Sequence, residues 1–248
     1  MSLAALLGVK PGLTALIGGG GKTTLLYALA EELKARGTVI VTTSTKIRVP
    51  EHLPVADPAT PEALADLLKE VSPLCLGSPW PVTNADTSLR AGGRLISAPT
   101  ALREPAGKLA APSLPFGALV RAADFVLVEA DGSRGLPAKA HAAHEPVIPA
   151  EAGTVILVLG ADAFGRPIRE VCHRPELYAE RVGAAPDTLL TPELAAGIMQ
   201  FEGYGNIFYV NKCETETAWK NAEALARLAS VPVAAGSLLT GRLEKLNY

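Results

Sequence analysis

The stretch LTALIGGGGKTTLLYALAEELK, residues 13–34, runs from an apolar segment through four glycines, a lysine and two threonines into a longer patterned segment. The short apolar run 13–17 predicts a buried strand, and the apolar positions of residues 25–34 recur at helical spacing. Glycines between a strand and a helix allow a tight turn whose N–H groups point inward, which suits a bound anion. The stretch therefore predicts a strand, a phosphate-binding loop and a helix.

The loop residues are typical of a nucleotide-binding P-loop. Lys22 is expected to reach the β- and γ-phosphates, and the hydroxyl of Thr23 is expected to ligate Mg²⁺. The full pattern GxxxxGK[ST] asks for glycine where Leu16 stands, and Ile17 replaces the lysine of some deviant loops. A purely structural glycine turn is the alternative, but the Lys-Thr-Thr ending favours ATP or GTP. The expected nucleotide-binding residues are Gly18, Gly19, Gly20, Gly21, Lys22, Thr23 and Thr24.

Short β-type runs alternate with helical patterns along the rest of the chain. The runs lie at residues 38–43, 74–76, 125–129, 155–159, 207–210 and 231–234, and the helical patterns at 61–70, 191–201 and 215–229. Such alternation requires crossover connections and predicts a mostly parallel sheet with helices on both faces. We expect an α/β, three-layer P-loop NTPase-like fold in one domain, residues 1–248. The Gly-, Pro- and Ala-rich stretch 84–118 interrupts the rhythm and is expected to form a hairpin insertion or a loop.

Two carboxylates follow the strand expected at 125–129. Glu129 and Asp131 occupy alternate positions, so they lie on the same side of an extended chain. A P-loop site needs an acidic group at a neighbouring strand end to hold Mg²⁺. Either residue can serve as the metal-associated or catalytic carboxylate beside Lys22, or both can simply be solvated. Thr43 and Thr45, at the end of the second strand, can complete the metal shell or sense the γ-phosphate; β-propensity alone explains Thr43 equally well.

The segment Asn211-Lys212-Cys213-Glu214 follows an apolar strand. In GTP-binding proteins NKxD occupies such a strand end, where the carboxylate reads guanine. Glu214 is one methylene longer than the usual Asp. The later run Val231 to Ser237 resembles the next GTPase strand, so guanine is favoured slightly over adenine.

A polar segment follows Asp131. Arg134 and Lys139 are expected near the triphosphate or a second substrate. His141, His144 and Glu145 can bind a metal in principle, but hydrogen-bonded or surface roles are favoured for the histidines. His144 remains a candidate for contact with a substrate or partner.

Composition narrows the class of protein. The formal net charge of −2 shows no basic excess, which argues against nucleic acid as the main partner. The three cysteines are widely spaced without CxxC, so a disulfide framework is not expected. No apolar run approaches the ~20 residues that span a bilayer, and no cationic leader precedes the first apolar stretch. We expect no membrane partner and a cytoplasmic location.

Six segments together resemble one family, the selenium-dependent hydroxylase accessory proteins of the YqeC type. They are GGGGKTT at residues 18–24, TTSTK at 42–46, VEADGSRGLPAKAHAAHEPVIP at 128–149, GADAFG at 160–165, HRPE at 173–176 and NK at 211–212. Ser44 departs from the usual threonine and keeps the hydroxyl. The resemblance implies a role in maturing selenium-dependent molybdenum hydroxylases, with a molybdenum hydroxylase or a cofactor-maturation protein as partner. Asp162 and Arg174, within these segments, are expected to face the same crevice or an anionic partner group.

The leading hypothesis is a Mg²⁺-dependent P-loop NTPase of slow intrinsic turnover, with GTP slightly favoured over ATP. A small-molecule kinase or transferase, which binds its anionic substrate through Arg134, Lys139 and Arg174, is the second hypothesis. A nucleotide-dependent binding switch with little turnover is the third. Many NTPases of this kind act as dimers, so a homodimer is an expectation for the assembly.

Overall fold

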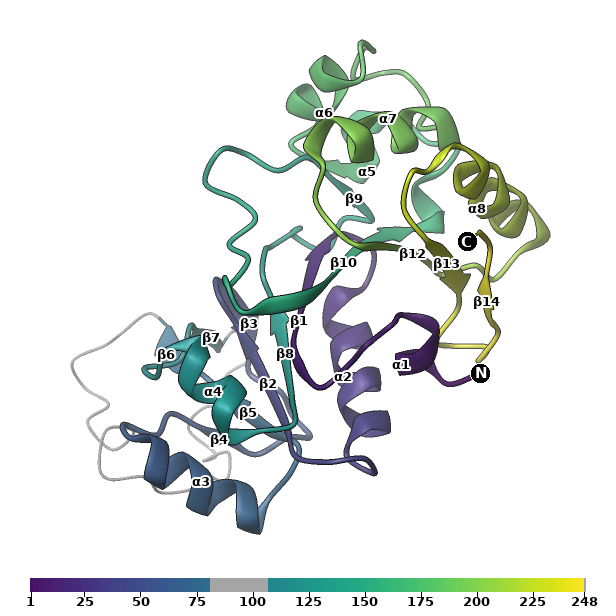
Figure 1. Ribbon diagram of the computed structural model, residues 1–248. Coiled ribbons are helices and arrows are strands. Elements are labelled where there is room, and N and C mark those ends of the chain that lie inside the picture. Colours follow the sequence, from purple (N-terminus) through teal and green to yellow (C-terminus); the bar gives the residue numbers. More distant parts are fainter. Residues whose placement is uncertain (81–106, 248) are drawn as a thin grey trace.

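The computed structural model describes residues 1–80 and 107–247 of the chain. Its centre is a nine-stranded sheet in the order β14-β13-β12-β10-β1-β8-β2-β5-β4 (Figure 1). Eight of these strands run parallel, and only β14 is antiparallel to its neighbour. The α/β prediction with a mostly parallel central sheet is confirmed. The strands are β1 Gly12–Gly18, β2 Val39–Thr43, β4 Val55–Ala56, β5 Leu74–Leu76, β8 Phe125–Glu129, β10 Ala152–Gly160, β12 Ile207–Asn211, β13 Val233–Gly236 and β14 Leu243–Lys245.

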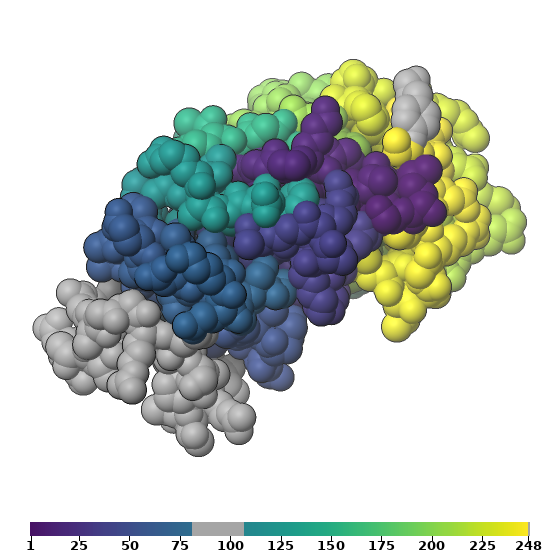
Figure 2. Space-filling model, turned by 60° about the horizontal axis from the view of Figure 1, so that its bottom comes forward, coloured from purple at the N-terminus to yellow at the C-terminus, as the bar shows by residue number. Residues whose placement is uncertain are grey.

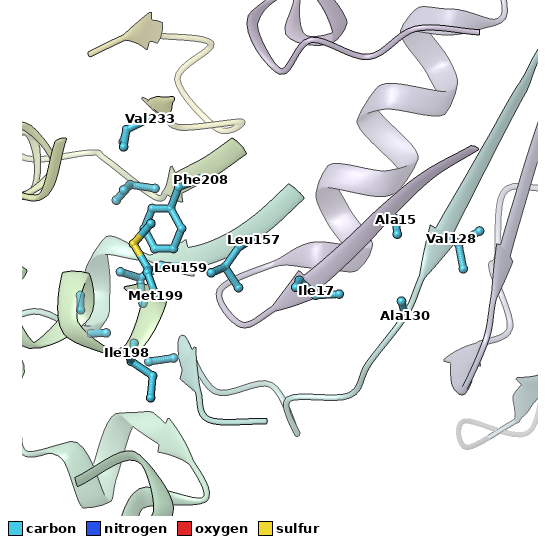
Figure 3. Close-up of a cluster of buried hydrophobic side chains, with 14 of the residues drawn as sticks. Ala15, Ile17, Val128, Ala130, Leu157, Leu159, Ile198, Met199, Phe208 and Val233 are labelled. Carbon is cyan, nitrogen blue, oxygen red and sulfur yellow. The ribbon is translucent and has the colours of Figure 1, made fainter. Parts of the chain in front are cut away.

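Helices cover both faces of this sheet, because successive strand residues point to opposite sides. Leu16 packs into the cluster that contains α1 and α2, whereas Ile17 packs into the cluster that contains α3, α4, α6, α7 and α8. Figure 3 shows Ile198 and Met199 of α7 facing Leu157 and Phe208 of the sheet. The helices are α1 Leu3–Leu6, α2 Lys22–Leu33, α3 Pro61–Glu70, α4 Phe116–Ala122, α5 Ile168–Val171, α6 Pro175–Arg181, α7 Pro192–Glu202 and α8 Glu216–Leu228.

Local sequence signals start three of these helices. Thr60, Thr191 and Thr215 each precede a helix and accept a hydrogen bond from the backbone N–H three residues later. A threonine at this position satisfies one of the N–H groups that a helix start leaves open. A proline is the first residue of α3 and of α7, a position where the N–H that proline lacks would have no partner within the helix. These signals explain why the patterns at 61–70, 191–201 and 215–229 match observed helices.

Short elements complete the structure. β9 Ala138–Lys139 pairs with β11 Cys172–His173, and β3 Lys46–Arg48, β7 Lys108–Ala110 and β6 Ser78–Trp80 form a separate antiparallel sheet. The expected insertion at 84–118 falls largely outside the described residues; its described end forms β7 and the start of α4. The amino-terminal α1 packs against α2 and β14, and Figure 2 shows the purple amino-terminal residues against the yellow carboxyl-terminal ones. Among the described helices, none has the length and apolar character required to cross a bilayer.

The strand order determines where a ligand fits. β1 lies between β8 and β10. Strands β2, β5 and β4 lie beyond β8, and strands β12 and β13 lie beyond β10. In open parallel sheets the crevice beyond the carboxyl ends of the strands, where the winding direction reverses, is the usual binding site. The glycine loop after β1 lies at this reversal.

Candidate functional site

The backbone of the loop requires glycine at its tightest points. Gly18 and Gly20 have φ of +95° and +72°, values that side-chain-bearing residues rarely adopt. A Cβ on Gly20 would lie 2.1 Å from the backbone nitrogen of Gly160, and one on Gly18 would lie 2.4 Å from the carbonyl oxygen of Val158. Both glycines therefore allow the loop to approach β10 closely.

The amide groups of the loop divide into two sets. Gly18, Gly19 and Gly20 donate to the carboxylate of Asp131, the carbonyl of Val158 and the carbonyl of Leu136, at 2.9, 2.9 and 3.1 Å. In the described part of the chain, the next four amides, of residues 21–24, donate to no protein group. The first set holds the loop against the sheet. The second set forms an open cradle of N–H groups at the start of α2, which suits a phosphate group.

Lys22 is the first residue of α2, and its side chain folds back over the loop. Its ammonium donates to the carbonyl oxygen of Gly18 at 2.6 Å and lies 3.1 Å from Oδ1 of Asp131. Lys22 is only 4% exposed. The cation expected to bind phosphate is thus held beside the cradle by a buried carboxylate.

Glu129 and Asp131, alternatives in the sequence for the metal-associated carboxylate, have different surroundings. Thr23 donates through Oγ1 to Oε2 of Glu129 at 2.6 Å, so these two oxygen groups meet beside the loop. Burial raises the pKa of Glu129, although Lys22 and Thr23 oppose this shift. Thr43 donates to the backbone carbonyl of Glu129 at 2.7 Å. Oxygen donors of this type suit Mg²⁺, so Thr23 and Glu129 fit that ion, and Thr43 supports them through the backbone.

Asp131 instead lies at the centre of a buried cationic cluster. Its carboxylate lies 3.1 Å from the ammonium groups of both Lys22 and Lys139 and 2.7 Å from Nε2 of His141. Burial alone would raise the pKa of Asp131, but Lys22, His141 and Lys139 outweigh it and lower this pKa. Asp131 also holds the Gly18 amide. Its role in the structure is therefore to join three cations to the phosphate-binding loop.

His141 connects this cluster to α7. Its Nδ1 lies 2.5 Å from Oε2 of Glu202, and its backbone N–H donates to Oε1 of the same residue at 2.8 Å. Burial lowers the pKa of His141, but the hydrogen bonds to Asp131 and Glu202 prevail and raise it. With a carboxylate at each ring nitrogen, both nitrogens act as donors. The sequence suggested the hydrogen-bonded role of His141, but no motif marked Glu202 as its partner.

Stability is expected to fall as the pH rises above about 6.5, the ordinary pKa of histidine. Because folding raises the pKa of His141, its contribution is complete below the unfolded pKa and is lost as the pH passes the folded pKa. Urea unfolding at a series of pH values from 6.5 to 9 measures this slope. His173, whose pKa burial lowers to about 4, is neutral in the folded state throughout that range, and in the unfolded state it also becomes neutral well above about pH 6.5.

His141→Gln should flatten this pH dependence, because the glutamine side chain does not titrate and so cannot become positively charged. His144→Gln is the matched control, since His144 is exposed and three residues away. Equal slopes in the two variants would contradict the assignment of a charged His141.

Asn211 ties the end of β12 to the loop. Its Nδ2 donates to the carbonyl oxygen of Gly20 at 2.9 Å across 191 residues of sequence. Glu214 accepts from Oγ of Ser237 at 3.1 Å, so the NKxE segment meets the segment after β13. Lys212 pairs with Asp162 at 2.7 Å on the surface. Residues expected to bind a base are thereby placed beside residues expected to bind phosphate.

The cations expected to bind a substrate differ in burial and in ion pairing. Lys139 is buried and lies 2.5 Å from Glu145, which also accepts from Arg174 at 2.7 Å. Arg134 and His144 are exposed. Glu145 therefore already compensates Lys139 and Arg174, and a substrate role for Arg134, Lys139, His144, Asp162 and Arg174 stays a prediction.

The described ranges 1–80 and 107–247 contain neither a preformed metal cluster nor a reactive cysteine. They hold no group of three or more His, Cys, Asp or Glu side chains arranged around a metal position. Cys75, Cys172 and Cys213 are buried and unpaired with one another. Burial raises the pKa of each thiol to about 12, so none is a reactive thiolate at neutral pH.

Comparison with known proteins identifies relatives of the chain. The family model described as "YqeC protein" matches residues 14–176, which include the loop, both carboxylates and the cationic cluster. A relative from Escherichia coli (strain K12), "Uncharacterized protein YqeC", is 34% identical over 203 residues, covering 78% of this chain and 70% of its own length.

Proposed function

Because this chain belongs to the YqeC family and has an open amide cradle at the start of α2, we propose that it is a Mg²⁺-dependent P-loop protein that binds and slowly hydrolyses a nucleoside triphosphate. The observation that carries this proposal is the row of amides at residues 21–24, which meet no protein acceptor in the described part of the chain. A helix start with free N–H groups and a lysine beside it favours a polyanion.

Each residue of the loop has a distinct role in this proposal. The cradle amides would bind phosphate oxygens, and the Lys22 ammonium would exchange Asp131 for the triphosphate. Thr23 and Glu129, already 2.6 Å apart, would hold Mg²⁺. When bound, Mg²⁺ neutralises charge on the phosphates. Lys22 and the amides would then stabilise the charge that develops on the transferring group.

Intrinsic hydrolysis should be slow because the carboxylates are poor bases in this arrangement. The cations around Asp131 lower its pKa, so it accepts a proton weakly. Glu129 is the better candidate, since burial raises its pKa, but Thr23 occupies one of its oxygens. A group from a partner protein would therefore accelerate turnover.

Titration with ATP and GTP, each with Mg²⁺ and then with excess EDTA, tests the proposal. We expect saturable binding that EDTA weakens, with GTP bound more tightly than ATP. Product analysis distinguishes hydrolysis from phosphoryl transfer, since hydrolysis releases free phosphate. Absence of triphosphate binding to the folded chain would end the proposal.

Glu214→Ala should weaken GTP binding about ten-fold or more, equivalent to about 1.4 kcal/mol or more, and leave ATP binding unchanged. A carboxylate can accept from the N1–H and amino groups of guanine, whereas adenine presents no matching donors at these positions. The Glu214–Ser237 hydrogen bond supports this role because it directs the carboxylate toward the segment after β13. Isothermal titration calorimetry measures both affinities. Glu216→Ala, an exposed change two residues away, is the control; equal losses for GTP and ATP would rule out guanine selection by Glu214.

The cellular role that we propose is that of an accessory factor in the maturation of selenium-dependent molybdenum hydroxylases. The block at residues 128–149 supports it through resemblance to proteins with that role, and this block supplies Glu129, Asp131, Lys139 and His141 to the site. Co-purification of the tagged chain with a molybdenum hydroxylase or a cofactor-maturation protein, in the presence and absence of GTP, tests the association.

A further inference from the structure

The small antiparallel sheet of β3, β6 and β7 separates apolar from basic side chains. Ile47 and Leu109, directly opposite each other in the register, are buried on one face. The positions on either side of the central one in each strand point the other way. Of these, Lys46, Arg48, Lys108 and Trp80 are exposed, whereas Ser78 and Ala110 are half-buried. Figure 1 places this sheet next to β2. We call the exposed side the basic sheet face; it consists of Lys46, Arg48, Lys108 and Trp80.

Among the described residues, no carboxylate pairs with the cations of the basic sheet face. Arg48 lies directly opposite Lys108, an arrangement of like charges that destabilises a strand pair. Within residues 1–80 and 107–247, none of the three cations forms an ion pair, and Asp57 at the sheet edge accepts instead from Ser78 and Ser113. Three uncompensated cations on so small a surface favour an anionic ligand.

Trp80 adds a second recognition element. It is 43% exposed and lies opposite Lys108, and the ammonium of Lys46 lies 3.7 Å from the centre of its ring. A planar ring can stack on an exposed indole, while nearby ammonium and guanidinium groups bind phosphate. A ligand whose phosphate draws Lys46 away would leave the indole face available for stacking.

The size of the face selects among anionic ligands. Strands of three residues span roughly 10 Å, and three adjacent strands also span roughly 10 Å. These dimensions match one mononucleotide-sized molecule and are short for a nucleic acid strand. We propose that the basic sheet face binds a small molecule that combines an aromatic ring with a phosphate group.

The face also lies close to the candidate nucleotide site. Lys46 is three residues after Thr43, so the Cα atoms of these two residues are at most about 11 Å apart. The hydroxyl of Thr43 donates to the backbone carbonyl of Glu129. Ser44, between them, donates its backbone N–H to Glu129 at 3.2 Å. A ligand here would lie beside the triphosphate. This neighbourhood rests on the proposed function, whereas binding to the basic sheet face does not.

The test compares flavin mononucleotide with riboflavin, which has the same ring and no phosphate. The chain contains two tryptophans, so Trp219→Phe leaves Trp80 as the sole indole. Flavin mononucleotide should quench its fluorescence saturably, and riboflavin should bind at least ten-fold more weakly. Equilibrium dialysis with the unaltered chain measures the same affinities if Trp219→Phe does not fold. Equal binding of the two flavins would overturn the proposal.

Two variants locate the binding site. The triple variant Lys46→Gln, Arg48→Gln and Lys108→Gln should lose at least ten-fold in affinity for flavin mononucleotide while retaining triphosphate binding. The control triple variant Lys69→Gln, Lys220→Gln and Arg227→Gln removes the same charge from exposed helical positions and should retain both. An unchanged affinity in the first variant would overturn the proposal.

Two further outcomes separate this inference from its competitors. Lys22→Ala should lower the affinity for triphosphate about a hundred-fold or more and leave the affinity for flavin mononucleotide unchanged. A similar loss for both ligands would place the flavin in the P-loop and overturn the separate site. An eight-nucleotide oligothymidylate should bind more weakly than flavin mononucleotide. Tighter, strongly salt-dependent binding of the oligonucleotide would instead identify a nucleic-acid surface.

Discussion

Lys22→Ala is expected to lower the affinity for Mg²⁺-bound triphosphate about a hundred-fold or more, consistent with the roughly 2–5 kcal/mol lost when one partner of a buried charged pair is removed. The ammonium lies over the loop, 2.6 Å from the Gly18 carbonyl oxygen, and in residues 1–80 and 107–247 no other lysine or arginine donates a hydrogen bond to a carbonyl of the loop. Titration calorimetry with GTP and ATP measures the loss. Because the cradle amides remain, weak residual binding should persist.

Lys34→Ala is the matched control for this variant. Lys34 follows the other end of α2, is exposed and pairs with Glu31 on the surface. Thermal unfolding of both variants separates lost binding from lost structure, because Lys22 also compensates Asp131. Wild-type affinity in folded Lys22→Ala would show that the loop does not bind triphosphate in the way proposed.

Asp131→Ala is expected to destabilise the fold by about 3–5 kcal/mol, as when one partner of a buried ion pair is removed. The change leaves Lys22, Lys139 and His141 without their shared carboxylate and the Gly18 amide without its acceptor. Lys139 would keep Glu145, and His141 would keep Glu202, so part of the cluster survives. Urea unfolding at neutral pH measures the difference in unfolding free energy.

Asp66→Ala provides the comparison for a pair that water already screens. Asp66 pairs with Lys69 on the surface of α3, where ion pairs contribute about 0–1 kcal/mol. Similar losses in the two variants would mean that Asp131 does not organise the cluster. A large loss for Asp131→Ala alone would support its role in joining the cations to the loop.

Local sequence predicted the framework well because short-range side-chain chemistry dictates it. The apolar runs at 74–76 and 125–129 coincide with β5 and β8, and the capped pattern at 61–70 coincides with α3. The edge strand β14 and the small sheet escaped prediction. Their strands are only three residues long, which is too short for an alternation to stand out, and their pairing depends on distant segments.

The sequence also predicted the main side chains of the site, but it did not predict which role each of them has. Glu129 and Asp131 were equivalent in the pattern, two positions apart after one strand. Only the surroundings separate them: Thr23 reaches Glu129, whereas Lys139 and His141 reach Asp131. The side chains that decide the difference come from helix α2, strand β9 and the segment just after β9. The spacing of Glu129 and Asp131 along the chain therefore carries no signal of it.

What the sequence by itself determined about this protein is the parallel α/β framework, the glycine loop between β1 and α2, and the family, because each depends on residues that are neighbours in the chain. Tertiary structure decided the rest: Asp131 reaches the amide of Gly18 across 113 residues, Glu202 reaches His141 across 61, and Asn211 reaches Gly20 across 191. These contacts exist because parallel pairing brings the carboxyl ends of β1, β8 and β12 to one edge and packs α7 nearby. A contact of that kind depends on strand order, which no local pattern contains.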